Sequence, residues 1–135
     1  MRIVLSLPRR LDGDLVRAAG ITANEYTVLM CLSEAPGREL RMADLANAAA
    51  LSASRMTRLV DDLQERGLVT KRGSVEDGRG NVAKLTPAGL AKLKAAWPAH
   101  LASVRDRVFD HVDPGCVKKA AQALSEVAAQ LEKCR

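Results

Sequence analysis

The chain has 135 residues, enough for one domain and too few for a large two-domain enzyme. Its 47% hydrophobic and 27% charged residues are ordinary for a folded protein and exclude a disordered chain. The net charge of +5 permits a polyanionic partner, but acids and bases are interspersed, so any nucleic-acid site depends on where the cations lie. Aromatic residues are only 2%, which disfavours a stacking platform for single strands.

The sequence offers no sign of a membrane protein or of a metal site. Its apolar stretches fall short of the roughly 20 residues that span a bilayer, and the N-terminal run is broken by a proline too early for a signal peptide. Cys31, Cys116 and Cys134 are an odd number without a CxxC motif, which favours a reducing cytoplasm. His100, His111 and Cys116 match no zinc spacing, so we expect no metal and no other cofactor.

The first third of the chain predicts two helices. Apolar residues at helical spacing indicate a first helix whose regular part begins at Pro8 and ends at Gly20. Thr22 and Glu25 then form a capping box that opens a helix running to about Glu34. Because this second helix is apolar on two sides, we expect it to be sandwiched between other elements.

A helix-turn-helix is predicted over residues 40–66. A short helix over 40–50 is followed by a tight turn, and Ser52 caps a second helix over 53–66 that ends at Gly67. The inward stripe of the second helix is predicted to be Met56, Leu59, Val60 and Leu63.

The opposite face of this second helix is the most informative surface in the sequence. Cations and hydroxyls fill its first two turns, at Ser52, Ser54, Arg55, Thr57 and Arg58. Acids follow at Asp61, Asp62 and Glu65. Arginine can bind a guanine edge or a phosphate, and a recognition helix enters the major groove with its N-terminal half, so we expect end-on insertion into duplex DNA. The alternative is a solvated helix with pairs such as Arg58–Asp62.

A β-hairpin is predicted directly after the helix-turn-helix, which makes it a wing. Its strands cover residues 68–72 and 81–85, on either side of a turn-rich segment. Arg79 lies between two glycines at the tip, where it can reach a minor groove, and Asp77 can hold its side chain in place. Arg72 on the first strand can meet a phosphate, while the alternative is an ordinary charged hairpin.

The C-terminal part predicts two further helices. Thr86 caps a long helix that starts at Pro87, and a last helix opens at residues 113–114. The terminal helices carry apolar stripes that one copy of a small domain could not easily bury. A two-fold homodimer would bury them mutually.

At these residues the sequence resembles the MarR family of bacterial winged-helix regulators. The segments that carry the resemblance are 40–46 (LRMADLA), 51–69 (LSASRMTRLVDDLQERGLV), 76–80 (EDGRG) and 85–89 (LTPAG). The most diagnostic piece is the Asp-x-Arg pair of the wing followed by Leu-Thr. The resemblance covers residues 9–131, although the first helix is predicted to be shorter than is usual for the family.

The resemblance implies a mainly α fold with a small β-hairpin wing and terminal dimerisation helices. Residues 1–135 would form one MarR-like domain, with dimerisation helices at 1–20 and 87–135 around a winged helix-turn-helix at 21–86. The expected protein is a cytoplasmic homodimeric repressor that binds a pseudo-palindromic double-stranded DNA operator and responds to a small-molecule or redox signal. The reactive cysteine of the peroxide-sensing branch is absent from the first helix.

The resemblance also implies an effector pocket between the dimerisation helices and the winged helix. A small aromatic or phenolic ligand could meet Arg17, Tyr26, Trp97 and His100 there. The alternative is that Tyr26 and Trp97 are core or dimer packing and that His100 lies on the surface. No nucleophile–base pair, carboxylate pair or phosphate loop is evident, so we do not expect an enzyme. The alternative function is a winged-helix protein-interaction module without DNA binding.

Overall fold

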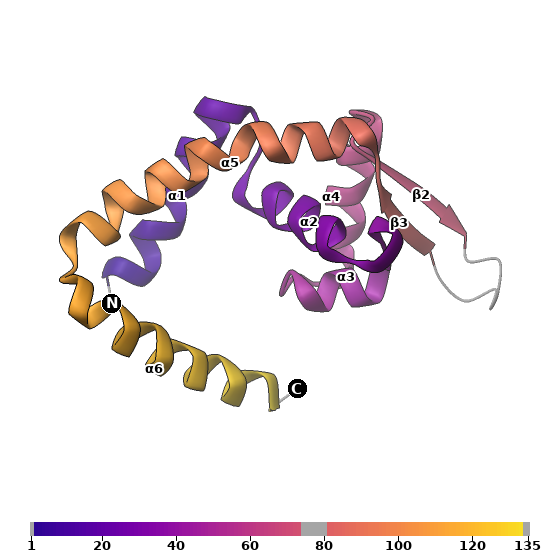
Figure 1. Cartoon of the computed structure of the whole chain (residues 1–135). Helices are drawn as coiled ribbons and strands as arrows, with labels where there is room; N and C mark the ends of the chain where they lie inside the picture. Colours follow the sequence, from indigo (N-terminus) through magenta and orange to yellow (C-terminus); the bar gives the residue numbers. More distant parts are fainter. Residues whose placement is uncertain (1, 74–80, 134–135) are drawn as a thin grey trace. The chain divides into compact units, whose positions relative to one another are not determined.

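The computed structural model describes residues 2–73 and 81–133, and these form a mainly helical fold with a small antiparallel sheet, which confirms the predicted fold class (Figure 1). In chain order the elements are α1 (Arg2–Ala19), α2 (Ala23–Glu34), the 3₁₀ helix η1 (Pro36–Arg38), β1 (Glu39–Arg41), α3 (Met42–Ala48), α4 (Ala53–Glu65), β2 (Val69–Gly73), β3 (Asn81–Leu85), α5 (Pro87–Arg107), the 3₁₀ helix η2 (Phe109–His111) and α6 (Pro114–Lys133). The chain divides into two compact units, residues 1–100 and 101–135.

Helix α1 begins earlier than the sequence predicted. It starts at Arg2 and continues through Pro8, so the prediction that the regular part begins at Pro8 is wrong. A proline inside a helix removes one N–H donor and crowds the preceding turn, but this costs one hydrogen bond in a helix of 18 residues. Leu15 anchors α1 in the core, and Gly20, at a φ of 63°, ends it as expected.

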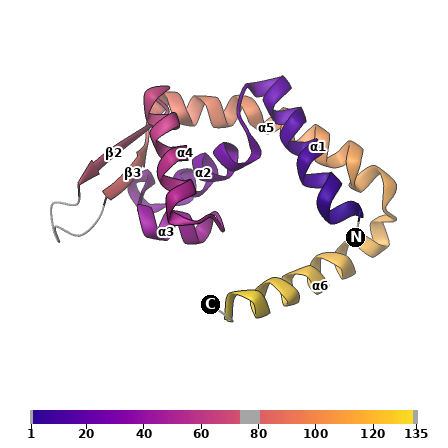
Figure 2. The ribbon, with the colours of Figure 1, turned by 180° about the vertical axis from the view of Figure 1, so that it is seen from behind.

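Helix α2 is the centre of the first unit. The predicted capping box is present: the Glu25 N–H donates to Thr22 Oγ1 at 3.2 Å, and the Thr22 N–H donates to Glu25 Oε2 at 2.6 Å. Side chains on more than one side of α2 are buried: Tyr26, Val28, Leu29 and Leu32. The helix contacts α1, α3 and the sheet, and it lies between α3 and the first turns of α5 in both views (Figures 1 and 2). The predicted sandwiching is therefore confirmed.

Helices α3 and α4 form the predicted helix-turn-helix. Ala50, at a φ of 53°, turns the chain between them, and the Ser52 hydroxyl accepts the Arg55 N–H at 3.4 Å to cap α4. Met56, Val60 and Leu63 of the predicted inward stripe are fully buried, whereas Leu59 is only partly buried against the core.

The sheet contains a strand that the sequence did not reveal. Its order is β1-β3-β2, all antiparallel, with Glu39 opposite Lys84 and Val69 opposite Leu85. Residues 40 and 41 were predicted to open a helix but instead pair with β3, and α3 starts only at Met42. Three residues are too few to show the alternation of a strand, so only the pairing partner reveals β1.

The N-terminus of α5 is closely joined to the end of the helix-turn-helix. The Thr86 hydroxyl accepts the Gly89 N–H at 3.0 Å and lies 2.8 Å from the Gly67 carbonyl oxygen. Gly89 is packed so tightly that a Cβ there would lie 2.1 Å from the Leu68 carbonyl oxygen. The backbone contact therefore requires glycine.

Several large apolar side chains are exposed in the single chain. They include Trp97 and Val16 in the first unit and, in the second, Leu101, Phe109, Val112, Leu124 and Val127. Leu124 is 69% exposed, although it belongs to the apolar stripe of α6. No helix in the described part of the chain combines the length and the apolarity that crossing a bilayer requires.

Candidate nucleic-acid interface

The predicted recognition face of α4 is exposed. Met56 and Val60 bind the helix to the core, and their burial turns the opposite arc to solvent. The predicted DNA-binding residues of this helix and its cap all lie on that arc: Ser52, Ser54, Arg55, Thr57 and Arg58. The structure therefore brings these five residues together on one surface.

The two arginines of this surface have no partner in the described part of the chain. Neither the Arg55 nor the Arg58 guanidinium makes an ion pair or hydrogen bond with the side chains that the structure describes, those of residues 6–73 and 81–130, and the alternative Arg58–Asp62 pair is not formed. The Thr57 hydroxyl, by contrast, donates to the Ala53 carbonyl at 3.0 Å. Exposed cations without a protein partner can bind an anion without first breaking an ion pair.

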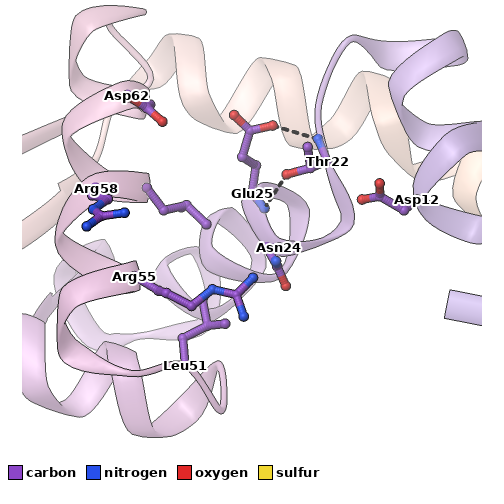
Figure 3. Close-up of a pocket in the computed structure, with 9 residues that line it drawn as sticks. Asp12, Thr22, Asn24, Glu25, Leu51, Arg55, Arg58 and Asp62 are labelled. Atoms are coloured by element: carbon purple, nitrogen blue, oxygen red, sulfur yellow. Dashed lines mark hydrogen bonds between the residues drawn. The ribbon is translucent and has the colours of Figure 1, made fainter. Parts of the chain in front are cut away.

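A cavity of about 380 Å³ lies beside these arginines (Figure 3). Its lining comes from α1, the start of α2, the turn before α4 and α4 itself: Asp12, Thr22, Asn24, Glu25, Leu51, Arg55, Arg58, Leu59 and Asp62. Figure 3 shows Arg55 extending from α4 toward the first turn of α2. The α4 wall of the cavity thus carries two cations and Asp62, and the opposite walls carry the carboxylates of Asp12 and Glu25.

The acidic half of α4 is bound to the rest of the protein. Asp61 forms an ion pair with Lys71 of β2. Arg66, the C-cap of α4, donates to Glu25 Oε1 at 2.6 Å and to the Gly20 carbonyl oxygen at 2.9 Å. The helix is therefore anchored at its C-terminal end. At its N-terminal end it presents two cations that have no partner among the described side chains, and there the helix dipole also favours an anion.

Arg72 is not a free cation. Its Nη2 lies 3.0 Å from both carboxylate oxygens of Glu39, and the Lys84 ammonium lies 3.4 Å from the same group. The hydrogen bond from Arg72, together with the charges of both cations, holds the pKa of Glu39 below its usual value. Arg79 and Asp77, the predicted wing-tip pair, lie outside the described residues.

Replacing Glu39 with glutamine should release the cations of the sheet. We expect Glu39→Gln to bind random-sequence duplex DNA about two- to threefold more tightly, with a salt dependence steeper by about one to two counterions, because Arg72 and Lys84 become available to phosphates. The thermal midpoint should hardly change, since exposed ion pairs contribute little to stability. Electrophoretic mobility shifts at several salt concentrations measure both effects. Glu34→Gln, an exposed carboxylate on α2, is the charge-matched control, and an equal gain there would contradict the prediction.

The structure brings together two of the four predicted effector residues. The rings of Tyr26 and His100 lie 4.7 Å apart, and the Tyr26 hydroxyl and His100 Nδ1 are buried with no hydrogen-bond partner among the described residues. Burial raises the pKa of Tyr26 and lowers that of His100. Trp97 is 52% exposed, and Arg17 is exposed and paired with Asp14.

Because burial lowers the pKa of His100, the stability of the folded protein should depend on pH. As the pH falls below about 6.5, the unfolded chain protonates this histidine while the folded chain keeps it neutral, so the folded state loses stability until its own lower pKa is reached. We expect the thermal midpoint to fall between about pH 7.5 and pH 5.5, and to fall less in His100→Gln. Calorimetry at both pH values measures this, and an unchanged dependence in the variant would show that another group is responsible.

The cysteines and acids of the described ranges are dispersed. No three histidine, cysteine, aspartate or glutamate residues within those ranges are gathered as a metal site would require. Cys31 is half-buried, and its burial, helped by the charge of Glu34, raises the pKa of its thiol, which makes it a poor nucleophile at neutral pH. Cys116 is exposed, and Cys134 lies outside the described residues.

Two residues of the site could not be found from the sequence. No element was assigned to Glu39 from the sequence, and nothing marked it as the partner of two cations of the sheet. Arg66 was predicted only as the end of a helix before a glycine, a position that does not show what its side chain reaches.

A helix-turn-helix with an exposed cationic second helix, followed directly by two antiparallel strands, defines the winged-helix class of proteins. Comparison with known proteins narrows the assignment to one family within this class. The family model described as "MarR family" matches residues 19–80. A MarR family transcriptional regulator from Streptomyces coelicolor, Sco3205, solved in complex with DNA, is 35% identical and superposes with a TM-score of 0.89 over 96% of this chain and 82% of that one. The chain belongs to the MarR family.

Other relatives agree with this assignment. AbsC, a MarR family transcriptional regulator from Streptomyces coelicolor, is 32% identical, with a TM-score of 0.87 over 98% of this chain and 88% of that one. The HTH-type transcriptional repressor Rv2887 of Mycobacterium tuberculosis is 36% identical over 77 residues, which are 57% of this chain and 54% of the relative. The match thus spans about half the length of the curated repressor.

Proposed function

We propose that the protein is a sequence-specific transcriptional repressor that acts in the cytoplasm as a homodimer on a pseudo-palindromic DNA operator. The observation that carries this proposal is the pair of exposed guanidinium groups of Arg55 and Arg58 on the first two turns of α4, which have no partner in the described part of the chain. The family membership, a relative solved with DNA and another named as a repressor support it.

The chemistry of the α4 surface suits a major groove. Either arginine can donate two hydrogen bonds to the O6 and N7 atoms of a guanine, while the hydroxyls of Ser52 and Ser54 can donate to phosphates. The Thr57 hydroxyl can do so only by giving up its hydrogen bond to the Ala53 carbonyl. The anchored acidic end would be repelled by a phosphate backbone if the helix lay flat, so the N-terminal end points into the groove. Arg72 and Arg79 are proposed to contact phosphates and the minor groove, with Asp77 orienting Arg79.

The homodimer is proposed from the exposed apolar residues. Residues 1–20 and 87–135 would pair with the same segments of a second copy, leaving residues 21–86 as the winged helix. The large apolar side chains exposed on α1, α5 and α6 support this arrangement, because mutual burial removes them from water. Sedimentation should give twice the mass of the 14.5 kDa chain.

A small aromatic or phenolic effector is proposed to act near Tyr26 and His100. Their buried hydroxyl and Nδ1 atoms have no partner in the described chain, and a ligand with a hydroxyl or carboxylate could supply one. Arg17 and Trp97 would complete the pocket only in the assembled dimer.

A footprint on the DNA flanking the protein's own gene tests the function. We expect protection of two half-sites about one helical turn apart and a steep loss of affinity with salt. Adding phenolic carboxylates should release the DNA if the effector proposal holds. If the protein binds this DNA and random duplex with equally weak affinity, the alternative function is favoured, a winged-helix protein-interaction module without DNA binding.

A further inference from the structure

The C-terminal end of the recognition helix is tied to the turn between α1 and α2. Arg66 Nη1 donates to Glu25 Oε1 at 2.6 Å, and Arg66 Nη2 donates to the Gly20 carbonyl oxygen at 2.9 Å. Both partners are far from Arg66 in the sequence: Gly20 lies in the turn after α1, and Glu25 lies in the first turn of α2. One guanidinium therefore joins α4 to the end of α1 and the start of α2.

The same turn is held to α1 by a second carboxylate. Asp12 of α1 accepts the Ala23 N–H at 2.7 Å, while the other oxygen of Glu25 accepts the Thr22 N–H at 2.6 Å. The hydrogen bonds thus form a continuous path from Asp12 through the first turn of α2 and Glu25 to Arg66.

The polar groups along this path are held in defined positions. The Glu25 side chain is only 12% exposed, and both of its oxygens are used. Gly20 has a φ of 63°, a conformation that few other residues adopt, so the carbonyl that Arg66 reaches is held in a defined place. Charge-assisted hydrogen bonds that are partly shielded from water are stronger and more directional than surface ion pairs.

We propose that Arg66 is a positioning residue for DNA recognition: it fixes α4 relative to α1, and so fixes the distance between the two recognition helices of the dimer. The inference rests on the proposed function, in which α1 contributes to the dimer interface. If α1 of each copy meets its partner, a fixed α4–α1 geometry sets the half-site spacing that the dimer accepts. One inserted base pair displaces and rotates a half-site, so a rigid dimer should reject it.

The test compares the operator with a version that carries one extra central base pair. The wild type should prefer the native spacing strongly. Arg66→Gln should bind the native operator about tenfold more weakly, while its affinity for the longer operator should change less than about threefold. Arg66→Lys, which can keep one contact with Glu25, should fall between the two.

Lys71→Gln is the matched control. It removes the same charge and breaks another ion pair of α4, that with Asp61, but this pair does not reach the α1–α2 turn. We expect any effect of Lys71→Gln to be equal for both operators. A loss in Arg66→Gln that is also equal for both operators would overturn the inference, because a general loss of fold acts on every DNA alike.

Amide hydrogen exchange provides a readout that does not need DNA. In Arg66→Gln the Thr22 and Ala23 amides should exchange faster, while amides within α2 such as that of Leu29 should keep their protection. Unchanged exchange at Thr22 would also overturn the inference. If the wild type itself does not distinguish operator from random duplex, the proposed function fails, whereas an operator-specific wild type with an unaltered Arg66→Gln refutes only the positioning role.

Discussion

Replacing Arg55 and Arg58 together by alanine should reduce operator affinity by about a thousandfold. Each arginine that donates two hydrogen bonds to a guanine contributes about 2 kcal/mol of discrimination, and the two contributions are expected to be nearly additive if the residues read different bases. Fluorescence anisotropy with a labelled operator measures the loss, and each single variant should relax specificity at its own base pair. Affinity for random duplex should fall much less, because other cations still meet phosphates.

The fold should survive this double replacement. Both side chains are exposed and make no ion pair with the described part of the chain, so the thermal midpoint should shift by no more than a few degrees. Lys94→Ala, an exposed cation on α5, is the charge control and should leave operator affinity within about twofold of the wild type. An operator affinity unaffected by the double variant would contradict the proposed recognition surface.

Gly89→Ala should destabilise the protein strongly, because the start of α5 leaves no room for a methyl group. The added Cβ would lie 2.1 Å from the Leu68 carbonyl oxygen and 2.8 Å from Leu85 Cδ1, so the backbone of α5 must move away from the end of the helix-turn-helix. Overpacking against backbone costs about 3 kcal/mol, which corresponds to a fall of about 10 °C in the thermal midpoint for a chain of this length. Thermal unfolding followed by circular dichroism gives the value.

Gly73→Ala is the matched control for this prediction. A Cβ at Gly73 would meet no atom within 4 Å, and its φ lies outside the left-handed region, so the same methyl group should change the midpoint by only about a degree or two. Equal midpoints for the two variants would mean that α5 is free to move away from Leu68. In that case Thr86 and Gly89 would not fix the start of α5.

The sequence predicted the structural features that depend on residues close together in the chain. The capping box of Thr22 and Glu25, the Ser52 cap and the buried stripe of α4 depend on contacts within a few residues, and helical periodicity exposes them directly. The same reasoning located Arg55 and Arg58 on the solvent face, because the burial of one side of a helix fixes the other.

Contacts between residues far apart in the sequence became visible only in the structure. Glu39 joins β1 to Arg72, Arg66 joins α4 to the α1–α2 turn, and Tyr26 lies against His100, and none of these pairs leaves a local pattern. The start of α1 was also predicted wrongly. Proline is common in the first turn of a helix, but α1 continues through Pro8, because a long helix can lose one hydrogen bond. Local spacing therefore determined which face of each helix is polar. The packing of distant segments decided which cations are neutralised within the protein and which are exposed without a partner among the described side chains.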